Sequence, residues 1–167
     1  MRWKTVAQLK STSSGDVMIV IRRARVKDLP ELEALLGVLF SIEADFEVDE
    51  AKQHRGLSLM LGSDTRQILV AQVDGRVVGM VSAQLVISTA EGGPSALLED
   101  LVVREEHRGI NIGARLLAKI EKWAVEKGAT RYQLLADRKN SPALAFYEKH
   151  GWHPTQLICL RKKLEGA

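Results

Sequence analysis

The chain of 167 residues has little cysteine, proline or aromatic content and no long hydrophobic run. Cys159 is the only cysteine, so an internal disulfide is excluded, and its apolar neighbours predict a buried thiol in a reducing, cytoplasmic setting. No apolar stretch approaches the roughly 20 residues that a membrane span requires. The N-terminus also lacks the features of a secretory signal. We therefore expect no membrane partner.

Massed charge of one sign is also missing. The formal net charge of +3 is spread along the chain, and aromatic residues make up only 5%, with no aromatic–basic alternation that would favour base stacking. Nucleic acid is therefore not an expected partner. The four histidines lack metal-ligand spacing, so we interpret them as surface or capping residues and predict no metal site.

The chain length and patterning predict an N-terminal extension over residues 1–17, which is serine-rich and flexible, followed by a single domain over 18–167. Two β-rich runs flank Asp74-Gly75, which is the strongest hairpin signal in the chain. Asp28 resembles a helix N-cap, and Leu134–Ala136 suits a strand that is buried on both faces. Strands are expected over 18–22, 67–73, 76–83, 96–103, 131–136 and 156–161, and helices after Asp28 and over 49–61, 113–127 and 141–150.

This order predicts an α/β fold with a central, twisted, mixed sheet flanked by helices. The step from the strand ending at Val103 to the strand starting at Arg131 should be parallel and right-handed. Between them, the basic, glycine-bearing turn 108–114 opens directly into a helix. Unpaired amides at such a helix start form a site in which a pyrophosphate would fit.

Two motifs resemble the GCN5-related N-acetyltransferase (GNAT) superfamily. The segment 108–113 reads RGINIG, similar to the family's acyl-CoA signature, and the segment 140–152 reads NSPALAFYEKHGW, similar to its Asn-x-x-Ala-x-x-x-Tyr segment. The likeness covers roughly residues 18–162 in element order. Asn111 stands where the family most often has glycine, and asparagine tolerates the left-handed backbone that this turn requires.

The resemblance implies a GNAT-like fold and an N-acetyltransferase that passes an acetyl group from acetyl-CoA to a primary amine of a small molecule or peptide, by direct attack. A non-catalytic acyl-CoA sensor is the alternative. By resemblance, the backbone of the strand before the turn binds pantetheine, the turn's amides and Arg108 bind pyrophosphate, and Asn140 contacts the cofactor arm. The residues so implied are Leu101, Val102, Val103, Arg108, Gly109, Ile110, Asn111, Ile112, Gly113, Ala114, Asn140 and Tyr147.

Two residues are candidates for catalysis. A leaving thiolate needs a proton, which the phenol of Tyr147 could supply; the alternative is a tyrosine packed in the core. Glu99 is the favoured base, because strand neighbours face opposite sides and only one of Glu99 and Asp100 can face the acyl group. Glu99 could instead be a strand-edge acid paired with a basic residue, and Asp100 is expected to bond to backbone or to an arginine. Asn140 could equally be a helix N-cap.

Acidic residues also gather between the first two expected helices, where they could form an acceptor pocket for a cationic amine. The favoured interpretation is a solvated cluster at a helix start. Its members are Glu43, Asp45, Glu47, Asp49 and Glu50. Homodimers are common in the family, so a homodimer is a further expectation, although no interface can be recognised in the sequence.

Overall fold

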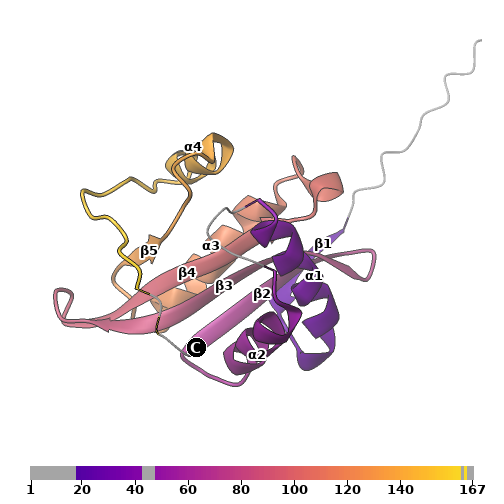
Figure 1. Cartoon of the computed structure of the whole chain (residues 1–167), viewed down its shortest axis with the longest axis horizontal. Helices are drawn as coiled ribbons and strands as arrows, with labels where there is room; N and C mark the ends of the chain where they lie inside the picture. The colour runs from indigo at the N-terminus through magenta and orange to yellow at the C-terminus, as the bar shows by residue number, and fades with distance from the viewer. Residues whose placement is uncertain (1–17, 43–47, 163, 165–167) are drawn as a thin grey trace, which may run out of the picture.

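The computed structural model describes residues 18–42, 48–162 and 164 of the chain, and it has a sheet between two layers of helices (Figure 1). The expected extension 1–17 lies outside these residues. The strands are β1 (Ile19–Arg23), β2 (Arg66–Val73), β3 (Arg76–Ser88), β4 (Gly93–Val103) and β5 (Tyr132–Leu134). The helices are α1 (Leu29–Phe40), α2 (Glu50–Leu61), α3 (Ile112–Glu126) and α4 (Ser141–Lys149), with short 3-10 turns at Val26–Asp28 and Glu105–His107.

The sheet has the order β1-β2-β3-β4-β5, with the first four strands antiparallel and β5 parallel to β4. This confirms the expected mixed sheet and the parallel step through α3. The β2–β3 hairpin turns at Asp74 (φ 48°) and Gly75 (φ 80°), both left-handed, as a two-residue hairpin requires.

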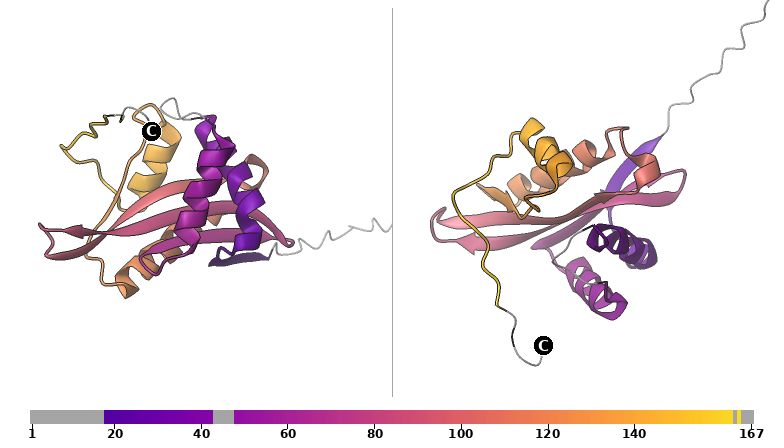
Figure 2. Two further views of the ribbon diagram at one scale, coloured as in Figure 1. Left: turned by 60° about the horizontal axis from the view of Figure 1, so that its bottom comes forward. Right: turned by 45° about the horizontal axis from the view of Figure 1, so that its top comes forward.

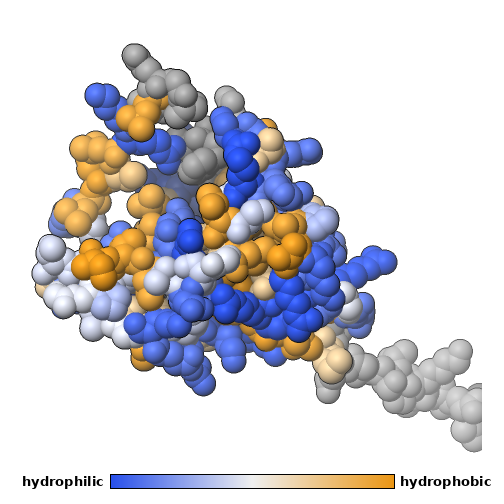
Figure 3. Space-filling view, turned by 90° about the horizontal axis from the view of Figure 1, so that it is seen from below, coloured by the Kyte–Doolittle hydropathy of each residue, from blue (hydrophilic) through white to orange (hydrophobic). Residues whose placement is uncertain are grey.

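Alternating side chains of the sheet supply two cores, one on each face. The right-hand view of Figure 2 shows α3 and α4 on one side of the sheet and α1 and α2 on the other. On β2, Leu69 and Ala71 pack toward α3, whereas Ile68 and Val70 pack toward α1 and α2. The apolar stripe of α3 comprises Ile112, Leu116, Leu117, Ile120 and Ala124. From the α1 and α2 side, hydrophobic side chains at the surface stand in separate patches among hydrophilic ones (Figure 3).

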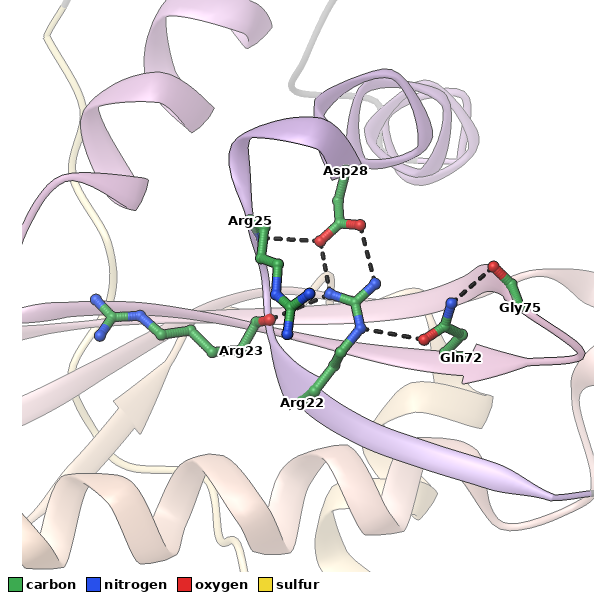
Figure 4. A network of polar contacts seen from close by, with 6 residues as sticks. All are labelled: Arg22, Arg23, Arg25, Asp28, Gln72 and Gly75. Atoms are coloured by element: carbon green, nitrogen blue, oxygen red, sulfur yellow. Dashed lines mark hydrogen bonds and ion pairs between the residues drawn. The ribbon is translucent and has the colours of Figure 1, made fainter.

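A polar network joins β1 to the start of α1 (Figure 4). Arg22 donates from Nη1 and Nη2 to the two oxygens of Asp28 at 2.7 and 2.9 Å, and from Nε to Gln72 at 3.1 Å. Asp28 does occupy the N-cap position of α1, but its carboxylate accepts from the Arg25 amide and the Arg22 guanidinium rather than from α1. The pKa of Asp28 is lowered, mainly by the hydrogen bonds from Arg22.

The C-terminal part of the chain departs from two expectations. Residues 156–161 were expected to close the sheet, but they form no strand, and Leu157 and Leu160 are each 86% exposed. The side chains of 134–136 were expected to be buried on both faces, yet Leu135 is 64% exposed. Because β5 ends at Leu134, it leaves no edge long enough to hold a six-residue strand. Cys159 is consequently exposed rather than buried.

Candidate active site

Strands β4 and β5 separate halfway along β4. Their pairing runs from Ala96–Tyr132 to Leu98–Leu134, after which β4 continues to Val103 with no described strand paired on that side. A cavity of about 80 Å³ lies at this gap, between the sheet, α3 and α4. It is lined by Leu39, Val81, Leu98, Glu99, Asp100, Leu101, Leu117, Leu134, Leu135, Ala136, Asp137, Asn140, Ala143 and Tyr147.

A β-bulge lies beside the gap. Met80 on β3 pairs with Val102, but Ser82 pairs with Glu99, so the two residues Asp100 and Leu101 occupy the space opposite a single β3 residue. Asp100 has a left-handed backbone with φ 50°, which breaks the alternation of side chains along β4. The expectation that Glu99 and Asp100 face opposite sides is therefore wrong, because both line the gap.

The two carboxyl groups are bound by polar groups of β3. Gln84 donates to Glu99 at 3.3 Å, and the Ser82 hydroxyl donates to Asp100 at 2.6 Å. Asp100 was expected to bond to backbone or to an arginine, so its serine partner is a correction. Desolvation raises the pKa of both groups, and the neighbouring Asp100 charge further raises the pKa of Glu99.

A second and larger cavity, of about 470 Å³, lies on the other face of the sheet beneath α1 and α2. Glu99 and Asp100 also line this cavity, so the bulge forms a boundary between the two spaces. The remaining lining residues are Leu36, Phe40, Asp49, Lys52, Gln53, Gly56, Leu57, Leu59, Met60, Arg66, Ile68 and Ser82.

The turn between β4 and α3 has the conformation expected of an anion site. Gly109 (φ 78°) and Asn111 (φ 68°) are both left-handed, which confirms that asparagine can occupy this position. Among the described residues, the first helical hydrogen bond runs from the Arg115 amide to the Asn111 carbonyl. The amides from Gly109 to Ala114 have no protein acceptor there, and they are free to face an anion.

The side chains of the turn differ in exposure. Ile110 is exposed, whereas Ile112 is buried in the core on the α3 side. Arg108 is exposed, and its Nε donates to the Val103 carbonyl at 3.0 Å, which ties the turn to the free side of β4. A Cβ on Gly113 would make ordinary contact with the Phe146 ring at 3.6 Å, so the two sequence motifs meet in space.

Helix α4 carries the second motif. Asn140 is its N-cap, with Oδ1 accepting from the Ala143 amide at 3.1 Å, and it also lines the gap. Tyr147 lines the gap as well, and its ring packs against Phe146 and Trp152 at centroid distances of 5.4 and 6.0 Å. The aromatic packing fixes the ring, so Tyr147 is both a packed tyrosine and a residue of the site.

Three further cavity residues were missed in the sequence. Gln53, Arg66 and Ser82 carry no motif: Gln53 lies mid-helix, and Arg66 and Ser82 occupy β-strand positions that alternation alone predicts as structural. Only the pairing of β2, β3 and β4 places Arg66 and Ser82 on the same cavity lining as the carboxylates. Of the expected acidic cluster, Asp49 caps α2 through the Lys52 amide and lines the cavity. Glu43, Asp45 and Glu47 lie outside the described residues.

In the residues that the structure describes, no three His, Cys, Asp or Glu side chains are grouped so as to hold a metal ion. None of the helices in this part of the chain is both long and apolar enough to cross a bilayer.

Comparison with known proteins identifies relatives over most of the chain. The model of the acetyltransferase (GNAT) family matches residues 31–152. The aminoalkylphosphonate N-acetyltransferase of Salmonella typhimurium is 30% identical over 139 residues, which cover 82% of this chain and 88% of that protein.

Solved structures show the same fold. An aminoglycoside N-acetyltransferase in complex with CoA superposes with a TM-score of 0.77 at 18% identity, covering 88% of this chain and 95% of that one. Glucosamine-6-phosphate N-acetyltransferase from Arabidopsis thaliana has a TM-score of 0.70 at 20% identity, with coverage of 87% and 98%.

Proposed function

This chain belongs to the GNAT family of acetyltransferases, and from that premise we propose which of its residues transfer an acetyl group from acetyl-CoA to a primary amine. The single observation that carries the proposal is the position of Glu99 and Asp100, which line both the β4–β5 gap and the larger cavity. The gap takes the acyl-CoA arm and the larger cavity takes the acceptor, so the two reactants meet at the carboxylates.

The free side of β4 supports the acyl-CoA assignment. Arg104 donates its amide to the Val78 carbonyl on β3, so the alternate residues Leu101 and Val103 direct their amides and carbonyls into the gap. Val102, paired with Met80, holds this segment in the sheet. An amide-bearing arm of pantetheine can add to such an edge in the manner of a strand.

The turn after β4 supports the binding of pyrophosphate. The amides from Gly109 to Ala114, which have no acceptor among the described residues, lie at the positive end of α3, which favours an anion. Arg108 adds a positive charge at the same point. Asn140 lies beside the gap, close enough to the arm's path to contact it while it caps α4.

We assign the proton transfers to two side chains. Acetyl-CoA supplies the activated thioester, and Glu99 accepts the proton that the attacking amine must lose. Its raised pKa makes it a stronger base than an ordinary glutamate, while Asp100 lies beside it on the same wall. Tyr147, held in the gap by its aromatic neighbours, donates a proton to the departing sulfur.

The acceptor is proposed to be a small primary amine. The large cavity has room for such a molecule, and its carboxylates suit a cationic amine. The Salmonella relative is named for aminoalkylphosphonate acceptors, which are small amines of this kind. This supports a small-molecule acceptor over a peptide.

A homodimer in the cytoplasm completes the proposal. Leu157, Ile158 and Leu160 are 63–86% exposed, and a second copy of the chain could cover them. A single unpaired cysteine suits a reducing compartment. Light scattering on the purified protein tests the dimer directly, since a monomeric mass at micromolar concentration would contradict it.

The reaction is tested by measuring thiol release from acetyl-CoA across a panel of amines, with calorimetry for coenzyme A in parallel. At least one amine should stimulate release, and Glu99→Gln should abolish most of that stimulation. Tight CoA binding without stimulated release would favour the non-catalytic sensor instead. Absence of any binding heat would contradict the acyl-CoA site itself.

Direct attack also predicts that Cys159 takes no part in the transfer. Cys159 is exposed in the C-terminal segment and lines neither cavity. We expect Cys159→Ala to retain most of the wild-type turnover. Near-total loss of thiol release in that variant would instead require a covalent acetyl-cysteine route.

A further inference from the structure

The acceptor cavity has polar groups at two separate places. Glu99 and Asp100 lie on one wall, at the bulge, and Gln53 and Arg66 lie elsewhere on the lining, on α2 and at the start of β2. The first pair carries negative charge or accepts hydrogen bonds. The second pair offers a ligand hydrogen-bond donors, the Nε2 of Gln53 and the guanidinium of Arg66, and the guanidinium adds one positive charge.

The donors at the second place have no partner in the part of the chain that the structure describes. Gln53 is only 7% exposed, and its Nε2 is buried without an acceptor among the described residues. The buried Nε of Arg66 likewise has none, and no described carboxylate forms an ion pair with Arg66. A buried donor without an acceptor destabilises a fold, so two of them on the lining of one cavity indicate that a ligand supplies the acceptor.

Strand pairing sets the distance between the two places. Ile68 on β2, Ser82 on β3 and Glu99 on β4 form one row across the sheet. Arg66 lies two residues before Ile68, so it is about 7 Å along the strand and about 10 Å across two strands from Glu99, or about 12 Å overall between Cα atoms. The long side chains shorten this span to the length of a small molecule with a charge at each end.

We propose that the acceptor is a short zwitterion: its amine lies at Glu99 and Asp100, and its anionic oxygens accept from Gln53 Nε2 and the Arg66 guanidinium. This inference rests on the proposed function, because it names the acceptor class of the same site. Oxygen anions are the acceptors that a guanidinium binds best, and both phosphonates and carboxylates satisfy this chemistry. Lys52 lies at the same cavity but is already paired with Asp49 at 3.5 Å.

The test compares four acceptors that share a short alkyl chain: 2-aminoethylphosphonate, 3-aminopropanoate, propylamine and 1,3-diaminopropane. The two zwitterions should have the highest kcat/KM, and the ranking between them shows whether phosphonate or carboxylate is preferred. Propylamine, which lacks an anionic group, or the diamine would overturn the inference if it were used as well as either zwitterion, while acetyl transfer itself would remain established.

Two variants locate the anion. Arg66→Met and Gln53→Met remove the donors but keep similar volume, and each should lower kcat/KM for the zwitterions by about tenfold or more, as expected for the loss of a hydrogen bond to a charged group. Propylamine turnover should change less than about twofold, because its lack of an anion leaves these contacts unused. Arg76→Met, on the exposed β2–β3 hairpin, is the matched control and should change kcat/KM neither for the zwitterions nor for propylamine.

Gln53→Met provides a readout that a purely structural role could not give. Removing an unsatisfied buried amide should raise the melting temperature of the free protein while weakening zwitterion use. Equal losses of kcat/KM with propylamine and with the zwitterions in this variant would overturn the inference.

A separate binding measurement distinguishes this inference from the proposed function. If no amine stimulates thiol release, the proposed function fails. Calorimetric binding of 2-aminoethylphosphonate to the wild-type protein, lost in Arg66→Met, would still support the zwitterion site. Absence of that binding would overturn it.

Discussion

At the scale of single residues, backbone conformation matters as much as side-chain chemistry. Among the described residues, three non-glycine residues have a left-handed backbone: Asp74, Asp100 and Asn111. All are Asp or Asn, the types that tolerate this conformation best. Two of the three lie in the candidate site, where one forms the bulge and the other forms the turn before α3.

Substitution of Asn111 should separate backbone geometry from side-chain function. Asn111→Gly should leave stability unchanged or slightly higher, and should keep or strengthen CoA binding, because glycine adopts φ 68° without strain. Asn111→Val should lower the free energy of unfolding by about 1–2 kcal/mol and weaken CoA binding, since a β-branched residue resists this conformation. Calorimetry with CoA measures the binding, and equal affinity of the Gly and Val variants would contradict the assignment.

The pH dependence of turnover should report on Glu99. Its raised pKa means that the carboxylate is protonated, and so inactive as a base, at pH values where an ordinary glutamate is ionised. Activity should therefore fall as the pH drops through a limb that lies above the ordinary value of 4.5. Glu99→Gln should remove this limb and lower kcat by about 10²–10⁴-fold.

The control is Glu126→Gln, at the exposed end of α3, which should keep both the rate and the acid limb. An unchanged profile in Glu99→Gln would assign the base to another group.

The contribution of Asp100 to stability should depend on pH in the opposite direction to that of a salt-bridged acid. Its raised pKa means that the folded protein binds the proton more tightly, so stability falls as the pH rises from 3.8 through the folded-state pKa. Asp100→Asn should therefore be more stable than the wild type at neutral pH, and this difference should vanish toward pH 3. Thermal melts at several pH values provide the measurement, and a variant that is less stable at pH 7 would contradict the prediction.

At the scale of elements, the site depends on the close approach of β3 and β4 beside the bulge. A Cβ on Gly79 would lie 3.0 Å from the Val102 carbonyl oxygen and 3.2 Å from Val103 Cγ2. We expect Gly79→Ala to lower the free energy of unfolding by about 1–3 kcal/mol, because the backbone of β4 must shift to admit the methyl group. Turnover should fall as well, since that shift moves Glu99 and Leu101.

Gly37→Ala is the matched control, in α1. A Cβ at Gly37 meets open space, so this variant should instead gain about 0.5–1 kcal/mol from helix propensity. Chemical denaturation of both variants gives the comparison. Equal stability changes in the two would contradict the close-approach argument.

Sequence patterning was sufficient for the elements whose signals are local. The hairpin at Asp74-Gly75 and the glycine-bearing turn at 108–114 that opens into α3 each follow from neighbouring residues, and the structure confirms them. The bulge could not be predicted, because nothing in the sequence distinguishes Asp100 from a residue of a regular strand, whose side chains alternate between the two faces. Because the bulge could not be predicted, the sequence also could not show that Glu99 and Asp100 line the same gap.

Long-range pairing explains the other differences. Residues 157–160 form a short apolar run that is typical of a strand, but a strand needs an edge, and β5 is only three residues long. Helix docking and β2–β3 pairing bring the donors Gln53 and Arg66 to one cavity. Neither can be recognised from the neighbouring residues in the sequence.

At the scale of the whole molecule, one buried ion pair ties the first strand to the first helix. The Asp28 side chain is 5% exposed and that of Arg22 is 18% exposed. Asp28→Ala should lower the free energy of unfolding at pH 7 by about 3 kcal/mol, because it leaves a guanidinium that is largely buried without its partner. Arg76→Gln, on the exposed hairpin, should cost nothing measurable.

The lowered pKa of Asp28 determines how the stabilisation from this ion pair changes with pH. Its contribution is fully present above the ordinary value of 3.8 and is lost as the pH falls through the lower, folded-state pKa. The stability gap between the wild type and Asp28→Ala should therefore close in strong acid. A gap that stays constant down to pH 2 would show that packing, rather than charge, accounts for the loss.

The bulge that carries Glu99 and Asp100 also bears on the timing of the reaction. The narrow space at the β4–β5 gap and the broad one beneath α1 and α2 are entered from opposite faces of the sheet. Neither bound reactant then blocks the entrance that the other uses, so the fold does not fix the order in which they bind. Initial-rate kinetics should show a random sequence of addition, with the spent coenzyme and the acetylated amine leaving by separate exits.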